Sequence, residues 1–135
     1  MKRHPLHRSL VSLSIALLCA SSASAADQVK VGLLSTLSGP GAGLGTDIRD
    51  GFQLAVKHMN GKIGNLPAEV VVVDDQQNPE VAKQTAERLL KRDKVDFMTG
   101  TVFSNVMLAV GPAAFQNKTF FISPNAGPTA SITLE

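Results

Sequence analysis

The chain has 135 residues, and its 13 Lys and Arg exceed its 11 Asp and Glu to give a formal net charge of +2. Lys2, Arg3 and Arg8 all stand at the very start, so the rest of the chain is close to neutral and lacks the basic patch that nucleic-acid binding requires. The single cysteine, Cys19, excludes an internal disulfide.

The first 26 residues have the pattern of an export signal. The basic start is followed by the apolar run 10–20, which is too short to anchor the chain in a bilayer, and by small residues at 23–26 that fit the cleavage rule. We therefore predict a signal peptide over residues 1–26, export to the periplasm, and no membrane insertion of the mature chain. Lipid attachment at Cys19 is the less favoured alternative, because Leu18 stands where a small residue is normally found.

Two apolar runs, Val29–Leu34 and Glu69–Val73, predict the first two strands. Neither alternates strictly between apolar and polar residues, so we expect both to be covered on both faces of a parallel sheet. The glycine-rich segment 36–46 is interpreted as a long flexible loop that faces a ligand, with an ordinary surface loop as the plainer alternative. Its glycines do not have the spacing of a nucleotide-binding loop.

A helix is predicted after this segment, with Thr46 or Asp47 as its N-cap and Asn60-Gly61 as its end. A second helix is predicted from Asn78-Pro79-Glu80, since Asn caps helices, Pro suits the first turn and Glu complements the helix dipole. Three further elements follow: a strand at Asp96–Met98, a helix that begins at Ser104 or Asn105 and is kinked or interrupted at Gly111-Pro112, and a strand at Thr119–Ile122. The alternation predicts one α/β domain, an open parallel sheet with flanking helices.

Parallel strands place their carboxyl ends at one edge of a sheet, so the loops after the last two predicted strands should lie side by side. Ser104 and Asn105 stand at a helix start, where unsatisfied backbone N–H groups and the helix dipole can hold a carboxylate without an arginine. The alternative is that they only cap the helix. Asn125, Ala126 and Gly127 are expected to form the adjoining wall, although they would also suit an ordinary Pro/Gly turn.

The remaining side chains indicate no catalytic chemistry. Phe103 is assigned to the core or, alternatively, to an apolar lid over the ligand. Adjacent Asp74 and Asp75 should point to opposite faces of the strand end, which suits turn and cap roles better than a proton-sharing pair. His58 is the only histidine after the signal, and no serine lies in a nucleophile motif. We therefore predict that the protein binds no metal and no cofactor and is not an enzyme.

These residues together resemble the leucine/isoleucine/valine-binding type of periplasmic solute-binding protein. The resemblance rests on Ser38-Gly39-Pro40 with Gly45, on residues 51–60, and on Asp74-Asp75 with Pro79. The segments 104–106 and 123–128 look closest to members that take aromatic carboxylates. The resemblance implies part of lobe one of a type I periplasmic binding protein fold. It also implies the candidate ligand-binding residues Ser38, Phe103, Ser104, Asn105, Asn125, Ala126 and Gly127, with Ser104 and Asn105 holding the carboxylate.

The resemblance also implies a mode of action. Two lobes of such proteins close over a small ligand, here a branched-chain amino acid or a related carboxylate such as an aromatic acid, and deliver it to an ABC-type membrane permease. Asn105 and Gly127 stand where branched-chain binders tend to keep a hydroxyl and a threonine, so both ligand classes stay open. Residues 27–135 are then an incomplete N-terminal lobe without the second lobe and hinge. The alternatives are a ligand-sensing regulator or receptor domain of the same fold and, more distantly, an exported α/β enzyme.

Overall fold

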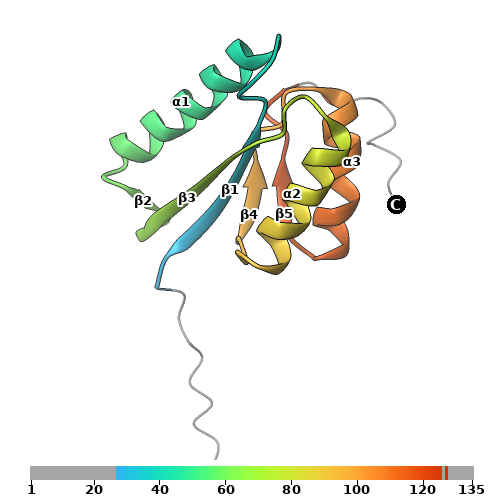
Figure 1. Ribbon diagram of the computed structural model, residues 1–135. Coiled ribbons are helices and arrows are strands. Elements are labelled where there is room, and N and C mark those ends of the chain that lie inside the picture. Colours follow the sequence, from blue (N-terminus) through green and yellow to red (C-terminus); the bar gives the residue numbers. More distant parts are fainter. Residues whose placement is uncertain (1–26, 126, 128–135) are drawn as a thin grey trace, which may run out of the picture.

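The computed structural model describes residues 27–125 and residue 127, which form one sheet with three helices (Figure 1). The elements in chain order are β1 (Val29–Ser35), α1 (Ala42–His58), β2 (Lys62–Ile63), β3 (Leu66–Asp74), α2 (Pro79–Lys91), β4 (Phe97–Thr99), α3 (Ser104–Gln116) and β5 (Phe120–Ile122). The predicted signal peptide and Ala126 lie outside the described residues.

The five strands are ordered β2-β3-β1-β4-β5. β1 lies parallel to β3 on one side and to β4 on the other, and β5 is parallel to β4. The predicted open parallel sheet is therefore confirmed. The antiparallel strand β2 was not predicted from the sequence, because two residues paired with the start of β3 are too few to produce a periodic pattern.

The helices lie on both faces of the sheet: α1 on one, α2 and α3 together on the other (Figure 1). The main core lies between the sheet and the two helices α2 and α3. Its fully buried members are Leu34, Ala82, Ala86, Leu89, Met98, Val106 and Val110. The start of α2 is as predicted, since the Asn78 side chain accepts hydrogen bonds from the backbone N–H groups of Glu80 and Val81.

The predicted long loop 36–46 is wrong, because α1 begins at Ala42 with Gly41 as its N-cap, and neither Thr46 nor Asp47 caps it. Gly45 lies inside the helix and is buried. A side chain there would overlap the carbonyl oxygen of Thr36, so this glycine permits close packing of α1 against the end of β1. Only the short segment 36–41 remains as a loop.

Two further expectations are corrected by the structure. α3 runs without interruption through Gly111-Pro112, and its N-cap is Phe103 instead of Ser104 or Asn105. The valines of β3 are partly exposed instead of being buried on both faces. Val71 and Val73 pack against the core, but β3 is flanked on its outer side by only the two residues of β2, so much of this strand reaches solvent.

Candidate functional site

Four loops leave the carboxyl ends of the parallel strands at one edge of the sheet. They are residues 36–41 after β1, 75–78 after β3, 100–103 after β4, and 123–125 after β5. The chain passes from β1 to β3 on one side and then crosses to β4 on the other, so the sheet changes winding direction between β1 and β4. Open α/β sheets bind ligands in the crevice at such a point.

The loops after β4 and β5 are joined by two hydrogen bonds. The Asn125 side-chain amide donates to the carbonyl oxygen of Val102 at 2.6 Å, and the Thr101 hydroxyl donates to the hydroxyl of Ser123 at 3.2 Å. This confirms the expectation that the two loops lie side by side. Asn125 is exposed and is held by its bond to Val102 beside the segment that leads into α3, Gly127 is exposed, and the predicted contribution of Ala126 lies outside the described residues.

The amino ends of α1 and α3 meet at the winding change. A Cβ atom on Gly41, the N-cap of α1, would lie only 2.6 Å from the Cε2 and Cζ atoms of Phe103, the N-cap of α3, so the ring lies directly against the Gly41 backbone. Phe103 is half-buried and packs against the core, which agrees with the first of its two predicted roles. The positive ends of two helix dipoles from opposite faces of the sheet thus converge at one place.

Neither of these two helix ends is closed by a side chain. No side-chain hydrogen bond caps α1 or α3, in contrast to α2, where Asn78 occupies that position. The first backbone N–H of α3 that has a partner within the helix is that of Met107, which donates to the Phe103 carbonyl. Ser104 and Asn105 are the first two residues of α3 and are exposed. Their N–H groups are therefore available to an anion.

Ser38 lies in the loop after β1 and interacts with Asp74. One oxygen of the Asp74 carboxylate accepts hydrogen bonds of 2.8 Å from the backbone N–H groups of Leu37 and Gln76. Burial opposes the ionisation of this carboxyl, but hydrogen bonds from Ser38, Leu37 and Gln76 outweigh it and hold its pKa below the ordinary value of 3.8. Asp74 thus fixes the loop that carries Ser38 and stays negatively charged.

Asp75 is completely buried and links the loop after β1 to the loop after β3. Its Oδ1 atom accepts hydrogen bonds from the Thr36 hydroxyl at 2.6 Å and from the backbone N–H of Gln77 at 2.8 Å. Its Oδ2 atom has no hydrogen-bond partner among the described residues. The predicted turn role of Asp74 and Asp75 is confirmed by these contacts, whereas the predicted cap role is wrong, because Asn78 caps α2.

Gly41 and Gln77 belong to this edge but were not predicted from the sequence. Gly41 was not recognised as an N-cap because the glycine-rich segment was interpreted as a loop. The helical spacing of Leu44, Ile48 and Phe52 is the signal that could have shown the earlier helix start. Gln77 has a positive φ of 56°, which glutamine seldom adopts, so its sequence context gave no signal.

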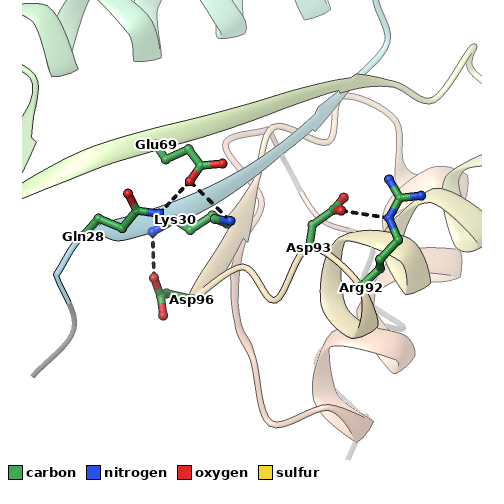
Figure 2. Close-up of polar contacts among 6 residues, drawn as sticks. All are labelled: Gln28, Lys30, Glu69, Arg92, Asp93 and Asp96. Carbon is green, nitrogen blue, oxygen red and sulfur yellow. Dashed lines mark hydrogen bonds and ion pairs between the residues drawn. The ribbon is translucent and has the colours of Figure 1, made fainter. Parts of the chain in front are cut away.

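Charged side chains gather at the opposite edge of the sheet, at the amino ends of the strands (Figure 2). There the backbone N–H of Lys30 donates to Asp96 at 2.7 Å, and the Lys30 ammonium lies 3.3 Å from the Glu69 carboxylate. At the carboxyl edge, the described loops contain no Lys or Arg. An anion at that edge would therefore be held by backbone N–H groups and neutral side chains.

Within residues 27–125, no group of His, Cys, Asp and Glu side chains is arranged to hold a metal ion. His58 is exposed at the end of α1. No helix in the described part of the chain combines the length and the apolar character needed to cross a membrane.

Comparison with known proteins places this architecture in context. The family model described as a periplasmic binding protein matches residues 28–133. The chain is 31% identical over 115 residues to Leu/Ile/Val-binding protein homolog 6 of Brucella abortus, an alignment that covers 84% of this chain and 30% of that protein. The chain thus spans about 30% of the length of the curated relatives it matches. The resemblance deduced from the sequence is confirmed.

Solved structures of proteins bound to two different classes of ligand share the fold. An R. palustris solute-binding protein of an ABC transporter, in complex with benzoate, superposes with a TM-score of 0.71 and 38% identity over 74% of this chain and 28% of that one. The branched-chain amino acid transporter substrate-binding protein LivJ of Streptococcus pneumoniae, in complex with isoleucine, superposes with a TM-score of 0.72 and 30% identity. That match covers 76% of this chain and 30% of LivJ. All of these proteins are described as binding proteins, in agreement with the prediction that the chain is not an enzyme.

Proposed function

The chain belongs to the family of periplasmic binding proteins, and from this premise we propose that it is the N-terminal lobe of a solute-binding protein that serves an ABC-type importer in the periplasm. Residues 27–135 form this lobe after removal of a signal peptide at residues 1–26. In the complete protein, a second lobe closes over the ligand and the closed form delivers it to the membrane permease. Binding involves no catalysis and no cofactor.

The ligand in this proposal is a small carboxylate that binds at the carboxyl edge of the sheet. The observation that carries it is the meeting of two uncapped helix amino ends at Gly41 and Phe103, at an edge where the described loops have no cationic side chain. Ser104 and Asn105 hold the carboxylate through the first turn of α3. Ser38, Phe103, Asn125, Ala126 and Gly127 line the rest of this lobe's side of the cleft.

Between the two ligand classes, we favour an aromatic acid over a branched-chain amino acid. An amino acid also carries an ammonium group, which needs an acceptor. On this lobe, Asp75 is completely buried, and Asp74 is engaged by Leu37 and Gln76. The 38% identity to the benzoate-bound protein points in the same direction.

The proposal is tested by calorimetric titration of the complete two-lobed protein with branched-chain amino acids, benzoate and 4-hydroxybenzoate. We expect an aromatic carboxylate to bind. Replacing Asn105 by Leu removes a polar partner and should weaken that binding by about 1 to 3 kcal/mol. Gln116→Leu makes the same change of an exposed amide at the far end of α3 and should leave the affinity unchanged.

Three results would contradict parts of this proposal. Binding of an amino acid alone would overturn the ligand class, and unchanged affinity in Asn105→Leu would overturn the role of α3. Turnover of any carboxylate by the purified protein would favour an enzyme over a binding protein.

A further inference from the structure

We propose that Gln77 is a specificity-determining residue of this site and that its side chain contacts the end of the ligand that lies farthest from the carboxylate. The inference rests on the proposed function, because it assumes a carboxylate held at the start of α3. It concerns a residue of the loop after β3, on the other side of β1 from α3.

The backbone around Gln77 is held in an unfavourable conformation. Gln76 and Gln77 have φ values of 55° and 56°, a left-handed region that is uncommon for residues with a side chain. Two carboxylates maintain it: Asp74 accepts from the backbone N–H of Gln76, and Asp75 accepts from that of Gln77, each at 2.8 Å. Strained backbone that the surroundings enforce in this way is typical of functional sites.

The strained loop brings the Gln77 side chain to the meeting point of the two helix ends. A Cβ atom on Gly41 would lie 3.0 Å from the Gln77 Oε1 atom and 2.6 Å from the ring of Phe103. The Gln77 amide and the Phe103 ring therefore lie close together over the Gly41 backbone. Gln77 is half-buried, whereas Gln76 is exposed.

The strand order determines what Gln77 can contact. Along the edge from β3 to β1 to β4, the sheet places Gln77, Gly41 and Phe103 in a row, and Ser104 follows Phe103 in the chain. A ligand whose carboxylate binds the first turn of α3 and whose ring lies by Phe103 has its far end toward Gln77. A side-chain amide offers both a donor and an acceptor, which suits a ring hydroxyl at that end.

The experiment compares benzoate with 4-hydroxybenzoate in calorimetric titrations of the complete two-lobed protein. In Gln77→Leu, we expect the affinity for 4-hydroxybenzoate to fall about tenfold, while that for benzoate changes by less than about twofold. Gln76→Leu is the matched control, since it makes the same substitution at a neighbouring position with the same φ, and it should leave the ratio of the two affinities unchanged. Gln77→Asn tolerates positive φ better but is shorter, so it should repeat the loss even if the leucine variant folds poorly.

The outcomes separate this inference from the proposed function. If the unaltered protein binds neither benzoate, the proposed aromatic ligand class fails. If it binds them but the Gln77 variants keep the same affinity ratio, or lose both ligands equally, the role of Gln77 is overturned and the proposed function stands.

Discussion

Asp74 and Asp75 are adjacent in sequence and perform related tasks in different environments. Asp74 is half-buried and fixes the loop after β1, while Asp75 is buried beneath the same loops and holds Thr36. Their role in a turn at the strand end could be predicted from the sequence, but not that Asn78 alone caps the helix that follows. The unusual backbone of Gln76 and Gln77 could not, because it depends on hydrogen bonds to both carboxylates that only the folded loop provides.

The lowered pKa of Asp74 predicts a defined pH dependence. Because the folded protein holds the carboxylate in its charged form, Asp74 stabilises the fold fully above the unfolded pKa, near 3.8, and this stabilisation is lost as the pH falls through the lower, folded pKa. Asp74→Asn keeps an acceptor oxygen without the charge. We expect its apparent melting temperature to lie below that of the unaltered protein near neutral pH, and the gap to close as the pH falls below 3.8 and through the lower, folded pKa.

Thermal unfolding followed by circular dichroism at a series of pH values measures this gap. A gap that stays constant down to the acid limit would show that the charge of Asp74 does not contribute.

At the scale of elements, helix α2 was predictable almost residue by residue, because Asn78 and Pro79 specify its start by local chemistry. The start of α1 was not. Its first turn contains Gly43 and Gly45, which weaken a helix in isolation, and the packing of the helix against Thr36 overrides that preference. The start of α3 was not predicted either, because its N-cap is Phe103, which packs against the core, and Ser104 and Asn105 lie exposed in its first turn.

Two glycines of α1 offer a matched test of this packing. Gly45→Ala places a methyl group on the Thr36 carbonyl oxygen and should destabilise the protein by about 1 to 3 kcal/mol or displace α1. Gly43→Ala meets no atom within 4 Å and should stabilise it by about 0.5 to 1 kcal/mol through higher helix propensity.

Denaturant unfolding of both variants gives the two free-energy changes. Equal effects of the two substitutions would contradict the close approach of α1 to β1.

For the whole molecule, the parallel sheet and the position of its loops at one edge could be predicted from the order of strands, loops and helices. How much of the apolar surface of the sheet and its helices stays exposed could not be predicted. Phe115, Phe120 and Ile122 are 73%, 69% and 47% exposed. A surface hollow of about 270 Å³ between α3 and β5 is lined largely by apolar side chains, among them Met107 and Phe121. Exposed apolar surface of this kind is costly in an isolated domain.

We therefore predict that residues 27–135 on their own are marginally stable and self-associate. A hydrophobic dye should bind them, and sedimentation should show oligomers. Phe120→Lys should reduce both effects with little loss of structure, because this side chain is already exposed. A sharp, reversible two-state melt with a high midpoint, from a monomer that binds no dye, would contradict this prediction.

The convergence of two helix amino ends on a bound carboxylate is most directly tested by the crystal structure of the complete protein with its tightest aromatic acid. We predict that a carboxylate oxygen lies within hydrogen-bond distance of the backbone N–H groups of Ser104 or Asn105, with the ring against Phe103. A carboxylate bound by the other lobe alone, with the start of α3 facing solvent, would contradict the account.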